Sequence, residues 1–336
     1  MTPVSELSSN APSITDRVRT VKTGAPVVGA HFIGGTPVFV LGEEALLFAP
    51  EGGEKRVPVH GGAILAGVSD GKRILTGGDD GRVVETSAEG EVKEVAADSK
   101  KRWIDQLALA GDGSFAYSAG KTAFVQPKKG DVRNMDAPST VAGLAFAPKG
   151  FRLAVAHYNG VSLWFPNSQA AAEKLEWKGS HLGVAFSPDG RFIITAMQEA
   201  TLHGWRVADG KHMRMSGYSA RVRSFNWSGD GAYLATSGSE QLILWPFGGK
   251  DGPMGQQPKM LAPMQARVSM VACHPKQPVV ATGYADGMVL LVRAEDGAEI
   301  VARRPGGAPV TALEWDRKSE RLGFGTEDGE AGVLSL

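Results

Sequence analysis

One short pattern of apolar and polar positions recurs along the chain. An apolar run is followed by a polar turn that ends in Gly, and then by a second apolar run, as in "FSPDGRFIITA" at 186–196. Related versions occupy 109–119, 146–156 and 227–237. Short apolar runs bounded by Gly-containing turns are typical of β-strands rather than helices. The pattern therefore predicts an all-β protein built from repeated hairpins.

The turn glycines give the length of the repeat. Five of them occupy equivalent positions: Gly71, Gly113, Gly150, Gly190 and Gly231. Successive members of this set are 42, 37, 40 and 41 residues apart. Eight first strands are predicted, at 27–33, 64–68, 104–110, 141–147, 182–187, 222–228, 268–275 and 310–316. Four short strands about every 40 residues predict a β-propeller, since one such sheet cannot bury both of its faces without neighbours. The count predicts a single propeller of eight four-stranded antiparallel blades, with seven as the alternative.

The two ends of the chain complement each other in this scheme. The last repeat contains three strands and stops at "GVLSL" (332–336), while "RVRTVK" (17–22) is a strand without a repeat of its own. Placing the N-terminal strand in the C-terminal blade would leave no free sheet edge. We therefore expect the propeller to span 14–336, preceded by a mobile tail at 1–13 that is rich in Ser and Pro.

Three tryptophans occupy one equivalent position of the third strand, at Trp164, Trp205 and Trp245. Together with "VAFSPDGRFIITA" and "LILWPF", this arrangement resembles the WD-repeat family of propellers from about residue 17 onward. The chain lacks the Trp-Asp pair and the Gly-His pair of that family, which predicts an incomplete His–Asp–Ser/Thr–Trp hydrogen-bond network. The resemblance implies a non-catalytic protein–protein interaction platform or assembly scaffold.

Charge and cysteine content narrow the class of protein. Lys plus Arg number 36 and Asp plus Glu number 36, so the chain lacks the basic excess that phosphate-backbone binding calls for. Cys273 is the only cysteine, which excludes an intrachain disulfide and a cysteine-rich zinc site. No apolar run approaches the length of a membrane helix. We expect a monomeric cytoplasmic protein whose partners are proteins, with neither nucleic acid nor membrane among them.

Motifs for catalysis or cofactors are weak throughout. The paired Asp residues of "GDDGRVVE" (78–85) fit a strand-to-strand turn better than a cation site. His203 fits a packed or solvent-facing position on a strand better than a metal ligand, and Cys273 fits the core better than a nucleophile. We therefore predict no catalytic residue, no metal and no cofactor. The alternative is a propeller hydrolase or metal-dependent enzyme with its site at the central opening.

The resemblance also implies where a partner would dock. In the WD-repeat family, the loops before the first strand and the loops between the second and third strands share one face. Arg, Trp and Tyr most often dominate binding energy at interfaces. The predicted partner-binding residues on these loops are Arg102, Trp103, His157, Tyr158, His181, Arg221, Arg267 and Tyr284.

Overall fold

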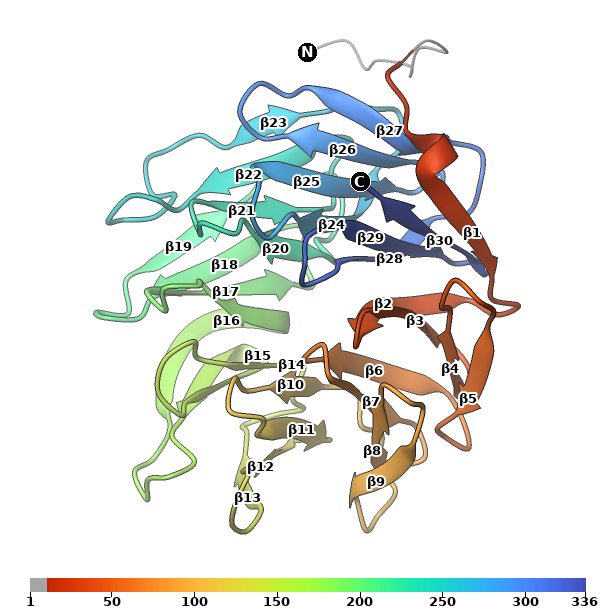
Figure 1. Ribbon diagram of the computed structural model, residues 1–336. Coiled ribbons are helices and arrows are strands. Elements are labelled where there is room, and N and C mark those ends of the chain that lie inside the picture. Colours follow the sequence, from red (N-terminus) through yellow and green to blue (C-terminus); the bar gives the residue numbers. More distant parts are fainter. Residues whose placement is uncertain (1–10) are drawn as a thin grey trace. The chain divides into compact units, whose positions relative to one another are not determined.

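The computed structural model describes residues 11–336, and nearly all of its regular structure is β-strand (Figure 1). The only helical segment of the described chain is the single 3₁₀ turn η1 (Thr15–Arg17). Packing divides the described residues into two units. The terminal unit contains the chain up to Leu41 together with Leu47–Arg56 and Tyr218–Leu336, and the central unit contains Gly42–Leu46 and Val57–Gly217.

Four sheets of four strands belong wholly or mostly to the terminal unit. The first sheet is β2 (Val27–Ile33), β3 (Thr36–Leu41), β4 (Ala45–Phe48) and β5 (Lys55–Pro58). The second is β20 (Phe225–Trp227), β21 (Tyr233–Thr236), β22 (Leu242–Pro246) and β23 (Lys259–Leu261). The third is β24 (Val268–Cys273), β25 (Val279–Tyr284), β26 (Val289–Arg293) and β27 (Glu299–Arg303). The fourth has the order β1-β30-β29-β28, from β1 (Val18–Lys22), β28 (Val310–Trp315), β29 (Arg321–Thr326) and β30 (Glu330–Ser335).

The central unit contains two four-stranded sheets and one of six strands. The first is β6 (Ile64–Ser69), β7 (Arg73–Gly78), β8 (Arg82–Ser87) and β9 (Val92–Ala97). The second is β10 (Leu107–Leu109), β11 (Phe115–Ala119), β12 (Thr122–Gln126) and β13 (Arg133–Asp136). The third is β14 (Gly143–Phe146), β15 (Leu153–Trp164), β16 (Glu173–Phe186), β17 (Phe192–Met197), β18 (Leu202–Arg206) and β19 (His212–Met215).

The described chain forms seven connected sheets, which is the alternative number given by the sequence. All eight predicted repeats are nevertheless present, because the six-stranded sheet contains two of them. Strand β16 pairs with β15 through its first half and with β17 through its second half. Because β16 runs unbroken from the last strand of one repeat into the first strand of the next, the two repeats share one sheet.

The turn glycines have the backbone conformation that the repeat requires. Gly71, Gly190 and Gly231 have φ angles of 78°, 77° and 70°. L-residues with a Cβ rarely adopt this left-handed region, so Gly is favoured there. The turn after β28 uses Ser319 instead, at a φ of 66°.

The predicted tryptophan positions lie in the core. Trp164, Trp205 and Trp245 are all buried, at exposed fractions of 7%, 2% and 8%. Trp164 packs in one apolar cluster with Leu144 and Leu153 of the same sheet. These large rings fill the space beside each sheet, as the repeat pattern predicts.

Parts of the polar network of the WD-repeat family are present in separate sheets. Trp245 Nε1 donates to the Tyr218 hydroxyl at 2.7 Å, and that hydroxyl lies 2.9 Å from Thr236 Oγ1. In the central unit, His60 Nε2 lies 2.9 Å from Thr76 Oγ1 and its Nδ1 lies 3.0 Å from Asp80 Oδ1. The first network has Tyr in the histidine position, and the second has no tryptophan bonded to it.

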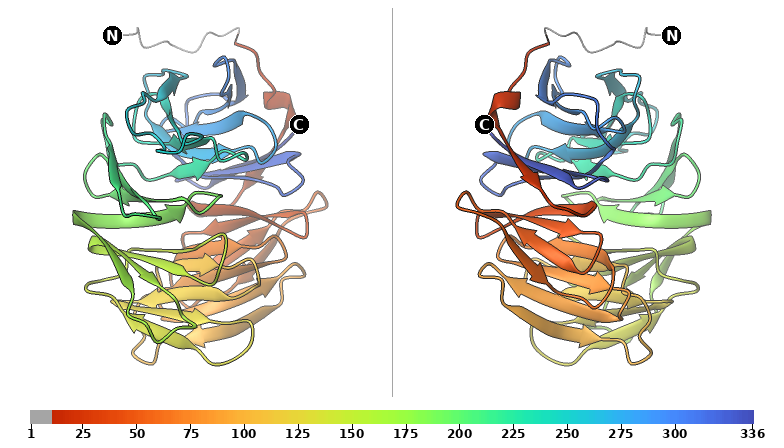
Figure 2. Two further views of the ribbon diagram at one scale, coloured as in Figure 1. Left: turned by 90° about the vertical axis from the view of Figure 1, so that its left-hand side faces the viewer. Right: turned by 90° about the vertical axis from the view of Figure 1, so that its right-hand side faces the viewer.

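The N-terminal strand completes the C-terminal sheet, as predicted. Strand β1 pairs antiparallel with β30, with Val18 opposite Leu334 and Lys22 opposite Glu330. Both views of Figure 2 show the red N-terminal strand beside the dark-blue C-terminal strands. Of the predicted tail, residues 1–10 lie outside the described residues. Ser13 forms a parallel bridge with Val301 of β27, so the placed chain begins before residue 14.

Candidate functional site

The eight predicted partner-binding residues fall in both units. Five belong to the central unit and three to the terminal unit: Arg102, Trp103, His157, Tyr158 and His181 in the former, Arg221, Arg267 and Tyr284 in the latter.

Three of these side chains are buried, which corrects their placement on an exposed surface. His181 and Tyr284 have exposed fractions of 0%, and His157 has 6%. The Tyr284 hydroxyl donates to the Ala262 carbonyl at 3.0 Å, and His157 Nε2 lies 2.9 Å from Ser162 Oγ. These hydrogen bonds are made inside the protein, so the buried side chains stabilise the fold instead of facing a partner.

Arg102 is committed to an ion pair that shapes its loop. Its Nη2 lies 2.7 Å from Oδ1 of Asp98, a carboxylate that is itself buried. The side-chain hydrogen bond from Arg102 lowers the pKa of Asp98 to about 2. The next residue, Trp103, has an exposed fraction of 65%. The pair therefore holds the loop that presents Trp103 to solvent.

Arg221 and Arg267 lie on the connectors that precede β20 and β24. Gly238 joins the two segments, because its N–H donates to the carbonyl of Val268, directly after Arg267, at 3.1 Å and its carbonyl accepts the N–H of Ala220, directly before Arg221, at 3.0 Å. Arg267 Nε lies 3.9 Å from Glu240 Oε1 in a half-exposed pair. The structure therefore brings the two arginine-bearing loops together within the terminal unit.

Tyr158 lines a cleft of about 320 Å³ in the central unit. Tyr158 lies in the middle of β15, and its exposed fraction is 56%. The other residues of the cleft come from β16, the end of β17, the β17–β18 turn and β19, and they are Trp177, Lys178, Gly179, Met197, Glu199, Thr201 and Arg214. We call this set of residues the Tyr158 cleft.

Hydrogen bonds behind the cleft hold its shape. The N–H of Tyr158 donates to Ser139 Oγ at 2.9 Å, and the N–H of Gly179 donates to Asn159 Oδ1 at 3.1 Å. His181 Nε2 donates to the Trp177 carbonyl at 2.9 Å. Because burial lowers the pKa of His181, this imidazole is neutral at pH 7.

A buried histidine supports the aromatic wall of the cleft. The ring of His203 stacks on Trp177 with 4.2 Å between ring centroids and meets Trp205 edge-on at 4.7 Å. Among residues 11–336, neither of its ring nitrogens has a hydrogen-bond partner. Burial first, and then the charges of His212, His181 and Arg214, lower the pKa of His203 to about 3. His203 is thus a neutral packed ring, in agreement with the packing alternative for this residue.

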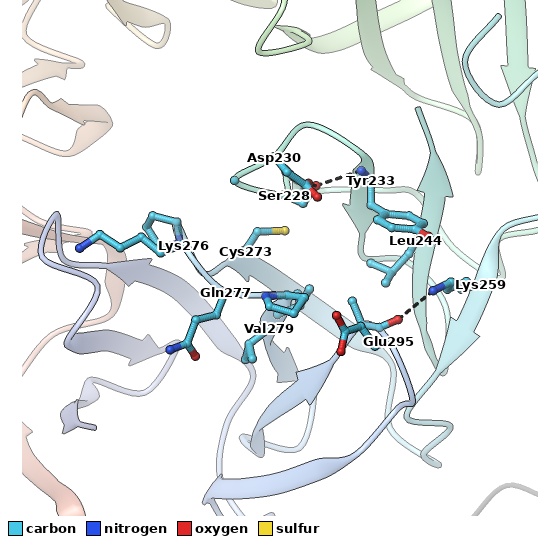
Figure 3. Close-up of a pocket in the computed structure, with 15 residues that line it drawn as sticks. Ser228, Asp230, Tyr233, Leu244, Lys259, Cys273, Lys276, Gln277, Val279 and Glu295 are labelled. Atoms are coloured by element: carbon cyan, nitrogen blue, oxygen red, sulfur yellow. Dashed lines mark hydrogen bonds between the residues drawn. The ribbon is translucent and has the colours of Figure 1, made fainter. Parts of the chain in front are cut away.

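A larger pocket of about 610 Å³ lies in the terminal unit between the sheets β20–β23 and β24–β27 (Figure 3). Its floor includes Leu244, Cys273 and Val280, and its rim includes Asp230 and Gln277. Burial raises the pKa of the Cys273 thiol to about 12, which keeps it protonated and inert. Cys273 is therefore a core residue, as its strand position predicts.

Sequence reasoning missed the two residues that give the Tyr158 cleft its chemistry, Trp177 and Arg214. A signal existed for Trp177, because it is an aromatic residue close to the start of the predicted first strand at 182–187. In residues 11–336 no three His, Cys, Asp or Glu side chains are grouped to hold a metal ion. No helix of that same range is long and apolar enough to cross a membrane.

Known proteins share parts of this sequence. The family model "WD domain, G-beta repeat" matches residues 211–245. WD repeat-containing protein slp1 of Schizosaccharomyces pombe is 28% identical over 166 residues, which cover 45% of this chain and 33% of that protein. WD repeat-containing protein 1-B of Xenopus laevis is 31% identical over 77 residues, covering 22% of this chain and 13% of that protein. WD repeat and HMG-box DNA-binding protein 1 of Xenopus laevis is 22% identical over 157 residues, covering 46% of this chain and 13% of that protein.

The chain thus matches a third or less of the length of these curated relatives. Among solved structures, the computationally designed Ika8 protein superposes with a TM-score of 0.77 at 17% identity, over 94% of this chain and 98% of that chain. The repeated antiparallel sheets define the class of the protein as an all-β propeller. Within that class, the family model and the relatives support the WD-repeat family, the one that the sequence resembles.

Proposed function

We propose that this chain is a non-catalytic protein-interaction platform and that the Tyr158 cleft is one surface on which a partner docks. The observation that carries the proposal is the grouping of exposed Tyr158 with Trp177, Arg214 and Glu199 around one cleft. Aromatic and arginine side chains in a partly closed cleft are the usual sources of binding energy at protein interfaces. The names of the relatives, all WD-repeat proteins, agree with this role.

The cleft suits a short protein segment with one apolar anchor and flanking charges. Tyr158 and Trp177 offer apolar surface, while Arg214 and Glu199 offer one charge of each sign. Burying an anchor beside rim charges gives both affinity and orientation. The overall balance of 36 basic and 36 acidic residues favours such a partner over nucleic acid.

The test compares proteins captured from the source cell by three forms of the chain. The cleft variant carries Tyr158→Ala and Arg214→Glu. A matched control carries Val92→Ala and Lys93→Glu on exposed positions of β9, with the same change in charge. We expect the cleft variant to lose at least one protein that the wild type and the control both capture, with its melting temperature unchanged. Identical captured sets for all three forms would refute the cleft as a docking surface.

The arginine-bearing loops of the terminal unit are tested separately. Arg221→Glu with Arg267→Glu is expected to weaken capture of a partner without unfolding the chain. If capture persists at wild-type levels, those two loops are not part of the docking surface, whatever the result for the Tyr158 cleft.

A further inference from the structure

Three repeats place an arginine at the same point of the second strand. Arg73, Arg152 and Arg321 each stand two residues after the residue that closes the preceding turn in a left-handed conformation. Their shared position beside the next repeat suggests a shared task, and the contacts of two of them show what it is.

Arg73 and Arg321 each bridge two successive turns. Arg73 Nε lies 3.4 Å from Asp70 in its own turn, its Nη1 pairs with Glu85 of β8, and its Nη2 donates to the carbonyl of Gly113 in the next turn at 2.7 Å. Arg321 Nε lies 3.3 Å from Asp316, and its Nη2 donates to the carbonyl of Gly35 at 2.5 Å. A planar guanidinium can satisfy a carboxylate and a carbonyl at once, so one side chain joins two neighbouring sheets.

The repeat of β20–β23 lacks this arginine but keeps its carboxylate. Tyr233 stands two residues after the turn glycine Gly231, and Asp230 stands just before that glycine, where Asp70 stands in its own repeat. Asp230 accepts hydrogen bonds from Ser228 Oγ at 2.6 Å and from the Ala232 N–H at 2.9 Å. Within residues 11–336 no cation pairs with it. This repeat therefore has the carboxylate of the bridge, Asp230, but not the arginine that would pair with it.

The acceptor carbonyl is present as well. Gln277 stands two residues before β25, as Gly113 stands two residues before β11, and Gly35 lies in the corresponding turn directly before β3. Its carbonyl accepts the Val279 N–H at 2.8 Å and keeps a second lone pair. In Figure 3 the turn with Asp230 and the turn with Gln277 lie on opposite sides of the pocket, with Cys273 between them. The 610 Å³ pocket thus occupies the place where a bridging arginine would lie.

The charges around the pocket favour a single additional cation. Lys276 Nζ is turned to the next sheet, where it donates to the Lys318 carbonyl at 2.9 Å. Lys259 Nζ donates to the Ala294 carbonyl at 3.1 Å and lies 4.9 Å from the centre of the Tyr233 ring. Asp230 and the exposed Glu295 also line the pocket. The pocket thus holds two carboxylates, those of Asp230 and Glu295, and one lysine, Lys259, whose charge stays within it. One negative charge is left without a matching positive charge.

We propose that this pocket binds the arginine side chain of an extended segment from a partner protein, with the guanidinium between the Asp230 carboxylate and the Gln277 carbonyl. The guest arginine would take the place that Arg73 and Arg321 fill in their own repeats. Its aliphatic stem packs on Tyr233 and Val279. The site is separate from the Tyr158 cleft, and its test uses different residues in a different unit.

The test measures binding of three blocked tripeptides to the full chain by titration calorimetry. The probes are acetyl-Gly-Arg-Gly-amide, the lysine analogue, which keeps the charge, and the citrulline analogue, which keeps the shape without the charge. We expect the arginine peptide to bind most tightly, the lysine peptide more weakly and the citrulline peptide not measurably. Binding of the arginine peptide should also weaken as salt is added.

Two variants and one control locate the site. Asp230→Asn keeps the turn hydrogen bonds but removes the charge, and it should weaken arginine-peptide binding about tenfold or more. Tyr233→Arg supplies the missing bridge from within the chain, so it should abolish peptide binding and raise the melting temperature. The control Asp112→Asn changes the same kind of turn carboxylate, which accepts the Ser114 N–H at 2.9 Å, and should leave binding unchanged.

Several results would overturn the proposal. They are absence of arginine-peptide binding to the wild type, equal binding of the citrulline peptide, and unchanged binding to Asp230→Asn. If Asp230→Asn lowers the melting temperature, the folded Tyr233→Arg variant provides the test instead. Binding of the arginine peptide to that variant at the wild-type level would rule out the pocket as its site. None of these outcomes bears on the Tyr158 cleft.

Discussion

The indole N–H of Trp245 donates to the hydroxyl of Tyr218 across 2.7 Å, and both side chains are buried. Tyr218 lies on the connector before β20, while Trp245 lies on β22, so this bond ties a connector to the third strand of its own sheet. Burial raises the pKa of Tyr218 to about 12, and its hydroxyl therefore remains neutral and available across the physiological range.

Replacing Tyr218 by Phe should destabilise the protein by about 1–3 kcal/mol, because Trp245 Nε1 would lose its acceptor inside the core. Denaturant unfolding of the variant measures this loss. Tyr158→Phe is the matched control, since that hydroxyl is on an exposed ring and its removal should leave the free energy of unfolding unchanged. Equal stabilities for Tyr218→Phe and the wild type would contradict the assigned role of the bond.

Truncating a buried tryptophan of the repeat should lower the free energy of unfolding by more than the Tyr218→Phe change does. Trp164→Ala removes an indole packed against Leu144 and Leu153, with an expected loss of about 3–5 kcal/mol in the free energy of unfolding. Trp103→Ala, on an exposed ring, should change stability by less than about 0.5 kcal/mol. A chemical melt that shows no loss for Trp164→Ala would remove this residue from the core.

The pairing of the chain ends can be tested on two adjacent positions of β1. Val21 is fully buried and Lys22 is exposed. Val21→Asp places an unpaired charge in the apolar interior, so the free energy of unfolding should fall by about 3 kcal/mol or more. Lys22→Asp on the same strand should have a much smaller effect. Similar melting curves for the two variants would mean that β1 does not hold the C-terminal sheet.

His203 predicts a stability that depends on pH. Its pKa is about 3 in the folded chain and about 6.5 when unfolded, so the unfolded state binds the proton first as pH falls. The stabilisation is complete above pH 6.5 and is lost as pH falls from there toward 3. Between pH 7.5 and pH 5 the loss from this group is about 2 kcal/mol.

Denaturant unfolding at those two pH values measures the effect. His203→Phe keeps an aromatic ring but cannot be protonated, and it should therefore show a smaller drop in stability over the same interval. A drop of the same size in the variant would assign the pH dependence to other groups, such as His181 and His274, whose pKa values burial also lowers.

The sequence was informative about the repeat because its period is set by local chemistry. Each turn needs a residue in the left-handed conformation, and each strand needs apolar side chains, so both features recur in the amino-acid sequence. The fusion of two repeats into one six-stranded sheet was not predictable, since it depends on β16 continuing without a break through Lys178 and Gly179. Nothing in the composition of that segment distinguishes a connector from a continuous strand.

The candidate site was less predictable for a related reason. Position along a repeat shows which loop a residue occupies, but it does not show how deep its side chain lies. His181 and Tyr158 were predicted on equal grounds, yet the first is fully buried and the second is more than half exposed. The pocket between Asp230 and Gln277 has a clearer signal in the sequence, because Tyr233 replaces the arginine found at positions 73, 152 and 321.

The pairing of β1 with β30 has a consequence for how the protein is made. Val18 is synthesised more than 300 residues before its partner Leu334. At usual rates of synthesis the first strand waits for roughly 15 to 60 seconds before its partner exists. Throughout that interval β1 presents an unpaired backbone edge, so a chaperone that shields extended segments would find its substrate on the nascent chain and lose it once β30 has been made.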